Sequence, residues 1–170
     1  MRLGGGAGQD ITIAMIVSGW LAHDDRLRIT GIEALEASVF ASGIVTPAIK
    51  RIGGRARPIQ NLGARSWHPL DHDYDSFPSG HSTNAWAIAT VIAKRYDDSR
   101  VIPYVAYAAA TSVSLARVDI NVHWASDVVA GALIGRAVAH GVVGRHLTLL
   151  PSRHGVVLIW RATMTPSDGT

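Results

Sequence analysis

Two residues in the second half of the chain have types and a spacing suited to nucleophilic or acid–base chemistry. His123 is followed four residues later by Asp127, and on a helix this spacing places both side chains on one face. The carboxylate can then accept a hydrogen bond from one imidazole nitrogen and leave the other nitrogen directed at an electrophile. Taken alone, such a pair is more often an ordinary ion pair on a helix surface.

A second histidine lies in the sequence Pro78-Ser79-Gly80-His81, directly before an apolar run that predicts a helix. The free N–H groups and the positive dipole end of a beginning helix favour a bound anion. Gly80 permits close approach to the backbone, Ser79 offers a hydroxyl, and His81 could donate a proton to a leaving oxygen. An N-cap with an incidental histidine accounts for the same residues equally well.

Basic residues gather where another apolar run ends. Lys50 and Arg57 lie in a glycine-containing stretch and could bind one anion together, and Arg117 lies six residues before His123. Taken alone, the stretch is more typical of a solvated helix end or a lipid-headgroup contact. The formal net charge of +3 is modest and the cluster is local, which indicates an anion pocket and no nucleic-acid partner.

In this order, the three segments resemble the signature of the type 2 phosphatidic acid phosphatase superfamily. This superfamily includes lipid phosphate phosphatases, bacterial nonspecific acid phosphatases and vanadium haloperoxidases. The resemblance covers residues 50–127 and rests on Lys, six residues, Arg-Pro; then Pro-Ser-Gly-His; then Arg, five residues, His, three residues, Asp. The family's serine before the arginine is replaced by Ala116. We expect this change to weaken a supporting contact without abolishing activity.

The resemblance implies a metal-independent phosphatase that needs no cofactor. His123 would attack phosphorus to give a phosphohistidine, Asp127 would orient His123, and His81 would protonate the leaving group. The remaining motif residues would bind the phosphate: Lys50, Arg57, Ser79, Gly80 and Arg117. The apolar composition favours a lipid-linked phosphate monoester or diphosphate as substrate, and no protein partner is evident.

Other functions remain open at this point. A soluble nonspecific acid phosphatase of the same superfamily would share all the motifs, whereas a haloperoxidase is expected to be a much larger protein. The loop His68–Asp75 is rich in metal-ligating side chains and could belong to a metal-dependent hydrolase, although its spacing matches no closed metal motif. A catalytically inactive membrane module is a further alternative, disfavoured by the intact Lys50, His81 and His123.

The elements that must position these residues are predicted to be helices. Apolar residues make up 48% of the chain and charged residues 17%, below the roughly 25% of an ordinary soluble domain. Five apolar runs lack the two-residue alternation of strands, so we expect an all-α bundle of about five to six helices. The family resemblance implies that the site lies at one end of this bundle. The runs are Ile11–Ala22, Gly31–Ile49, Ser79–Ala93, Val101–Ala116 and Ser126–Val143.

A membrane-embedded bundle is favoured, although several runs are shorter than the about 20 residues that cross a bilayer. Small residues such as Gly131 and Gly135 would allow close helix contacts in lipid. A soluble bundle stays open because Glu33 and Arg136, for example, fall inside apolar runs and must face protein or water. The expected location is a bacterial-type cell membrane, with the site facing outward because short basic connections lie at the opposite end.

The length fits one domain. We predict a single phosphatase domain over residues 1–150 and a flexible tail over 151–170. The apolar run near the N-terminus has no evident signal-peptide cleavage site. The chain has no cysteine, which excludes disulfides, thiol catalysis and cysteine-ligated zinc.

Overall fold

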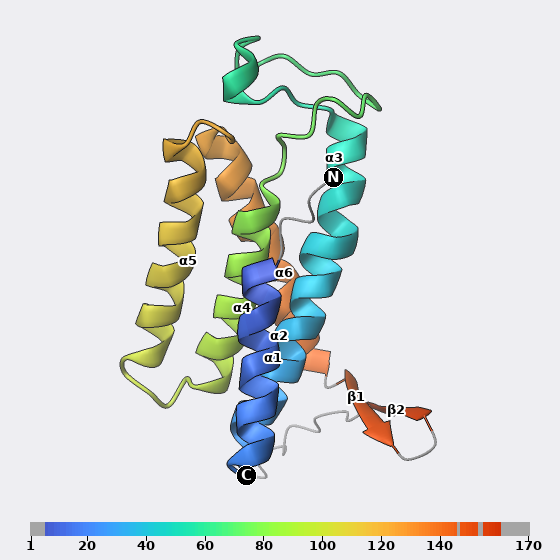
Figure 1. Ribbon diagram of the computed structural model, residues 1–170, viewed down its shortest axis with the longest axis vertical. Coiled ribbons are helices and arrows are strands. Elements are labelled where there is room, and N and C mark those ends of the chain that lie inside the picture. Colours follow the sequence, from blue (N-terminus) through green and yellow to red (C-terminus); the bar gives the residue numbers. More distant parts are fainter. Residues whose placement is uncertain (1–5, 146, 153–154, 161–170) are drawn as a thin grey trace, which may run out of the picture.

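The computed structural model describes residues 6–145, 147–152 and 155–160. Within these ranges six α-helices form an elongated bundle, which confirms the predicted all-α architecture (Figure 1). Each of the five apolar runs lies in one helical stretch, apart from one end residue in three of them. The helices are α1 (Gly6–Leu21), α2 (Asp25–Ser38), α3 (Thr46–Gly53), α4 (Gly80–Arg95), α5 (Ile102–Asp119) and α6 (Ala125–Arg145).

Helices α2 and α3 are two parts of one continuous helix. A π-helical segment, η1 (Val39–Val45), joins them, and the Thr46 hydroxyl donates to the carbonyl of Ala41 at 2.8 Å. The combined stretch Asp25–Gly53 is long and apolar enough to cross a membrane, as is Ala125–Val143 within α6. The continuous helix carries Lys50 to the same end of the bundle at which α4 begins (Figure 1).

The contact between α4 and α6 is unusually close. A Cβ atom added to Gly131 would lie 2.6 Å from the backbone oxygen of Ser79, and one added to Gly135 would lie 2.2 Å from the backbone oxygen of Thr83. Both glycines are therefore required for the two backbones to approach this closely. The predicted use of small residues for helix contact is confirmed here, and it fixes the start of α6 against the start of α4.

The distribution of apolar residues differs from that of a water-soluble bundle. Among the residues whose burial the structure describes, nine of the twelve buried hydrophobic residues are alanines, and the largest fully buried side chain is Val91. Hydroxyl and amide groups join the helices inside, as in the 2.5 Å bond from Ser38 to Asn84. Large apolar side chains such as Trp20, Phe40 and Leu133 are exposed. Large apolar side chains are thus more frequent on the outside of the bundle than inside it.

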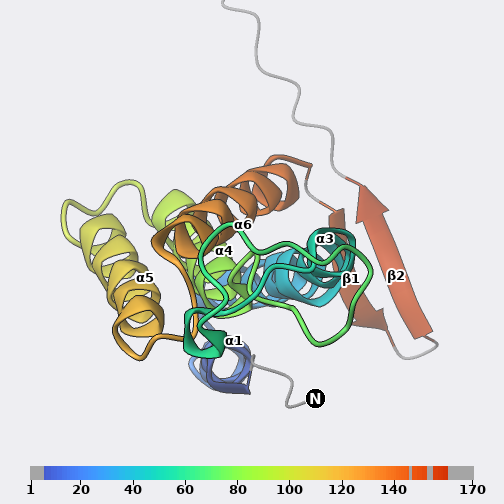
Figure 2. The same cartoon turned by 90° about the horizontal axis from the view of Figure 1, so that it is seen from above.

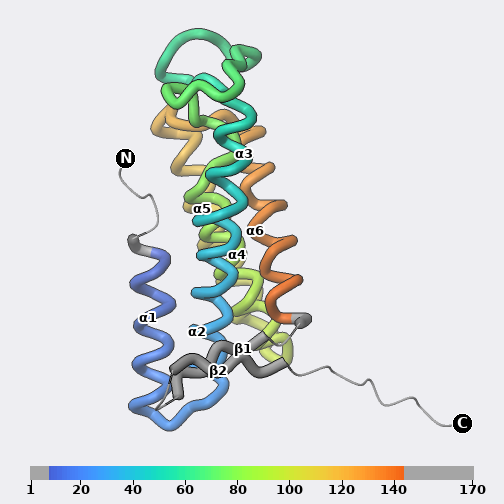
Figure 3. The backbone as a smooth tube through the Cα atoms, turned by 90° about the vertical axis from the view of Figure 1, so that its right-hand side faces the viewer, coloured from blue at the N-terminus to red at the C-terminus, as the bar shows by residue number. Residues whose placement is uncertain are grey.

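A cap formed by residues 54–79 closes one end of the bundle (Figures 1 and 3). The cap contains a short 3₁₀ helix, η2 (Pro58–Gln60). The segment that enters the cap and the segment that leaves it are joined by a hydrogen bond of 2.9 Å from Ser76 N to the carbonyl of Arg55. Ile59 N donates to the carbonyl of Asn121 at 3.2 Å, in the turn between α5 and α6. Seen from above, the cap overlies the centre of the bundle, and α5 lies at the edge of the bundle (Figure 2).

The opposite end carries ion pairs and a hairpin. The buried carboxylate of Glu33 pairs with Arg95, so this acidic residue faces protein as expected, and Arg26 pairs with Asp98. Antiparallel strands β1 (Leu147–Ser152) and β2 (Gly155–Trp160) follow α6 and were not predicted from the sequence. Of the predicted flexible tail, residues 151–152 and 155–160 belong to these strands, and 161–170 lie outside the described residues.

Candidate active site

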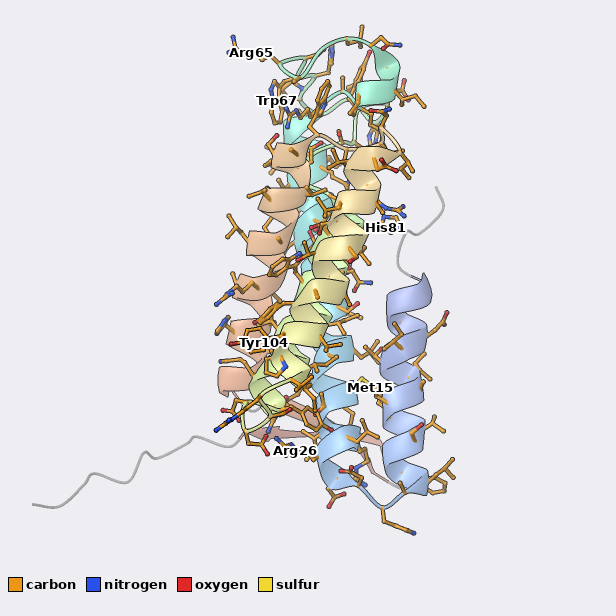
Figure 4. The ribbon with its side chains drawn as sticks, turned by 90° about the vertical axis from the view of Figure 1, so that its left-hand side faces the viewer. Met15, Arg26, Arg65, Trp67, His81 and Tyr104 are labelled. Carbon is orange, nitrogen blue, oxygen red and sulfur yellow. The ribbon has the colours of Figure 1, made fainter. Side chains whose placement is uncertain are left out.

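The structure brings all the predicted site residues to the cap end of the bundle. They come from six places along the chain, and Figure 4 shows His81 beside the upper turns of the helices, below the cap that carries Arg65 and Trp67. Lys50 lies in the last turn of α3, Arg57 just before η2, Ser79 to His81 at the start of α4, Arg117 in the last turn of α5, His123 in the following turn and Asp127 in the first turn of α6.

His123 and Asp127 do not share a helix, which corrects the sequence interpretation. Helix α6 begins at Ala125, so His123 lies in the turn before it, where its backbone N–H donates to the carbonyl of Arg117 at 3.2 Å. Nδ1 of His123 is 3.7 Å from Oδ2 of Asp127, longer than a hydrogen bond. Nδ1 is buried and has no hydrogen-bond partner among the described residues.

Asp127 is held by other groups. Its Oδ2 accepts from the hydroxyl of Ser76 at 2.5 Å and from the backbone N–H of Trp124 at 2.9 Å, while its Oδ1 accepts from Arg55 at 2.5 Å. The carboxylate is completely buried. A buried carboxylate with several donors stays ionised and fixed in orientation, which suits a group that must align an imidazole.

Arg55 is the residue that sequence reasoning missed. Its side chain is 8% exposed, and it also donates to Ser126 Oγ at 2.7 Å and to the carbonyl of Ala64 at 2.7 and 3.0 Å. It therefore ties the start of α6 to the far side of the cap. The available signal was weak, since the sequence shows only an arginine two positions before Arg57 in a stretch already rich in cations.

Two of the predicted phosphate-binding cations share a carboxylate. Nε and Nη2 of Arg57 donate to the two carboxylate oxygens of Asp75 at 2.8 and 3.1 Å. Nζ of Lys50 donates to the backbone oxygen of Asp75 and lies 4.0 Å from its Oδ2. The helix end of α3 and the cap are thereby joined at one point, with both cations beside each other.

Arg117 and His81 complete the positive side of the site. Nε of Arg117 is buried and lacks a hydrogen-bond partner among the described residues, so this donor is available to an anion. Burial, followed by the charges of Arg117, His123, Lys50 and Arg57, lowers the pKa of His81 below its ordinary value of 6.5. These groups must lie near His81 to act on it, and a bound anion would offset their effect.

The start of α4 supplies the remaining polar groups. Ser79 is the N-cap residue, with its hydroxyl accepting from Ser82 N at 3.5 Å and its own N–H donating to the carbonyl of Asp127 at 2.9 Å. The arrangement combines a helix N-terminus, four cationic or titratable donors and a buried histidine. Chemically, it can bind a phosphoryl group, attack it and protonate a leaving oxygen.

The alternative metal site in the loop His68–Asp75 finds no support in the geometry. His68 stacks on Tyr74 with ring centroids 3.9 Å apart, and His72 contacts Arg51 at 3.2 Å. In the parts of the chain that the structure describes, no group of three or more His, Cys, Asp or Glu side chains is close enough to hold a metal ion.

Ala116, which replaces the family's serine, is exposed on α5. Its backbone oxygen accepts from Ile120 N at 3.3 Å, which closes the end of the helix. At position 116 itself, the absence of the serine hydroxyl therefore leaves no buried polar group without a hydrogen bond.

Comparison with known proteins adds a family and relatives. The sequence model of the PAP2 superfamily matches residues 34–149. A lipid A 1-phosphatase of Rhizobium etli is 35% identical over 105 residues, covering 59% of this chain and 44% of that protein. The corresponding protein of Rhizobium johnstonii is 36% identical over 102 residues, covering 58% and 41%.

A lipid A 1-phosphatase of Porphyromonas gingivalis is 40% identical over 79 residues, covering 44% of this chain and 18% of that protein. The chain thus spans less than half the length of these relatives. No solved structure matches it.

Proposed function

Because the chain belongs to the PAP2 superfamily, we propose that it hydrolyses phosphate esters or diphosphates of lipids through a phosphohistidine intermediate. The observation that carries this proposal is a set of contacts at the cap end of the bundle. His123 N bonds to the carbonyl of Arg117, Ser79 N at the start of α4 bonds to the carbonyl of Asp127, and Lys50 and Arg57 meet at Asp75. The relatives named lipid A 1-phosphatase support a phosphorylated lipid as the substrate class.

In the proposed first step, Nε2 of His123 attacks phosphorus while the bond from phosphorus to the leaving oxygen breaks. His81 transfers its proton to that oxygen. Asp127 accepts the Nδ1 proton of His123 in a hydrogen bond and stabilises the positive charge that develops on the ring. Water then attacks phosphorus while His81 takes a proton from that water, and the bond from phosphorus to Nε2 breaks. This step releases inorganic phosphate, restores the imidazole of His123 and returns His81 to its protonated form.

The cations supply the electrostatic part of catalysis. Phosphoryl transfer depends mainly on positioning and on stabilising charge on the equatorial oxygens. Lys50, Arg57 and Arg117 would bind these oxygens, with Ser79 and the backbone N–H of Gly80 as neutral donors at the start of α4. Side chains of this protein can therefore fill the role that a metal ion has in other phosphatases.

The proposed location is a membrane. Two helices are long and apolar enough to span it, and the exposed large apolar side chains cover several helices of the bundle. Small residues and hydroxyl groups between helices are the usual means of association in lipid, where apolar surface gains little from burial. The site at the cap end would then lie at the membrane surface, within reach of lipid headgroups.

Purified protein in detergent should release inorganic phosphate from a lipid phosphate in the presence of EDTA. Orthovanadate should inhibit competitively, because a pocket for a five-coordinate phosphoryl transition state also binds trigonal-bipyramidal vanadate. Initial rates against substrate and vanadate concentration measure both effects. Loss of activity in EDTA that added metal restores would instead favour a metal-dependent hydrolase.

The proposed orientation, with the cap outside the cell, predicts a labelling pattern. Ser66 lies in the cap, and Ser99 lies in the α4–α5 connection near Arg26 and Asp98 at the opposite end. Single cysteine variants at these positions have a background free of native cysteine. An impermeant thiol reagent applied to intact cells should label position 66 and leave position 99 unlabelled, because basic connections favour the cytoplasmic side.

The reverse labelling pattern would contradict the orientation. Recovery of the protein in the soluble fraction, with neither position labelled until cells are lysed, would contradict membrane insertion itself.

A further inference from the structure

Asp75 engages the same groups to which the proposed function assigns the substrate phosphate. Its carboxylate accepts two hydrogen bonds from Arg57, and Nζ of Lys50 lies 4.0 Å from Oδ2. A carboxylate and a phosphoryl group present similar pairs of oxygens to a guanidinium fork. Asp75 and a phosphate would therefore compete for these donors.

The electrostatic surroundings of Asp75 agree with this placement. Burial opposes ionisation of its carboxyl group, but the bond from Arg57 and the charges of Lys50, Arg57 and His123 outweigh burial and lower the pKa of Asp75. The next residue, Ser76, bonds to Asp127, so this part of the cap lies against the segment that follows His123. Asp75 is thus an anion on the reaction side of the site.

The exposure of the side chains and the backbone contacts show how a phosphate could replace the Asp75 carboxylate on the two cations. The side chain of Asp75 is 48% exposed, against 19% for Lys50 and 32% for Arg57, so the carboxylate can turn toward water when another anion takes its place. The backbone at this point is held, because Ser76 N donates to the carbonyl of Arg55. Only the side chain of Asp75 needs to move, because Nζ of Lys50 has further N–H donors for a phosphate while it keeps its bond to the backbone oxygen of Asp75.

We propose that Asp75 is an internal competitor for the phosphate pocket, displaced from Lys50 and Arg57 when a phosphate binds and returning to them as inorganic phosphate leaves. The inference rests on the proposed function. Because the carboxylate must be displaced by substrate and product alike, it weakens the binding of both and limits inhibition by product. The ligand with which Asp75 competes is a phosphate group, either ester-linked or free.

The test compares Asp75→Asn with wild-type protein, using inorganic phosphate as the probe. Asparagine is nearly isosteric but uncharged, so it competes poorly for the two cations. The inhibition constant of phosphate should fall roughly tenfold, the size expected when one partly exposed ion-pair network no longer opposes binding. KM should fall in the same direction, and kcat should not rise.

Asp73→Asn is the matched control, because it removes the same charge from an exposed position two residues away in the same loop. It should leave the inhibition constant within about twofold of wild type, as a distant screened charge does. Asp75→Ala, with thermal unfolding measured alongside, guards against a local effect of the asparagine amide and should also bind phosphate more tightly.

An unchanged or larger inhibition constant in both Asp75 variants would overturn the proposal and identify Asp75 as a support for Lys50 and Arg57. Direct titration of phosphate into the detergent-solubilised protein separates this result from failure of the proposed function. If the wild type does not hydrolyse lipid phosphates, the proposed function fails, whereas tighter phosphate binding by Asp75→Asn would still support the competition.

Discussion

Replacing His123 with alanine is expected to lower phosphatase turnover by at least about a thousandfold, since the proposed covalent intermediate cannot form without its nucleophile. The residue is 4% exposed and lies in a turn tied to Arg117 and followed by α6, so removing the ring should leave the surrounding backbone in place. Turnover of a lipid phosphate and the thermal unfolding temperature, measured on the same preparation, separate loss of chemistry from loss of fold.

Asp127→Asn provides the graded comparison. It keeps the nucleophile but removes the negative charge that orients the imidazole, so measurable activity should remain above that of His123→Ala. Trapping with a radiolabelled phosphate ester and acid-stability analysis should show a phosphohistidine in wild type and none in His123→Ala. Near-normal activity in the alanine variant would refute the mechanism and leave the cation pocket as an anion-binding site.

Replacing Arg55 with methionine is expected to have the second-largest effect. The substitution would leave Asp127 as a buried carboxylate without its cationic partner, and breaking such a pair costs about 3 kcal/mol or more of unfolding free energy. Turnover should also fall more than tenfold, because Asp127 would no longer be fixed toward His123. KM should change little, since Arg55 is directed at Asp127, Ser126 and Ala64 and not at the phosphate.

Arg55→Lys and Arg65→Met are the matched variants. Lysine keeps the charge but lacks the planar fork that reaches three acceptors, so it should recover part of the stability and less of the turnover. Arg65 is an exposed arginine of the same cap (Figure 4), and its replacement should change neither quantity appreciably. Wild-type stability and kcat in Arg55→Met would show that the Arg55–Asp127 ion pair contributes nothing to the site.

The helices could be predicted from the sequence, because apolar runs without alternation are a local signal. The gathering of the motif residues at one end could be expected from the family resemblance, since the motifs must share one phosphate. The start of α4 after Ser79 was predictable from a local signal too, an N-cap before an apolar run. The roles assigned to the motif residues remain predictions.

The contacts made between distant segments could not be predicted. The bond from Arg55 to Asp127 joins residues 72 positions apart, and the pairing of Asp75 with Arg57 depends on how the cap folds back on itself. The four-residue spacing of His123 and Asp127 suggested one helix, but α6 begins between them. The hairpin after α6 could not be predicted, because its second strand is a short continuous apolar run, which periodicity alone does not assign to a strand.

The close contact at Gly131 and Gly135 has a mechanical consequence. Two backbones in direct contact resist shear and separation more than two layers of flexible side chains do, so α4 and α6 should move as one rigid body. Ser79, at the start of one helix, and Asp127, at the start of the other, then keep a constant separation during turnover. The compliance that substrate entry and product exit require must therefore reside elsewhere, in the rotamers of side chains on the cap. The rigid part of the pocket is thus the pair of helices α4 and α6, and the part that moves is the set of side chains on the cap.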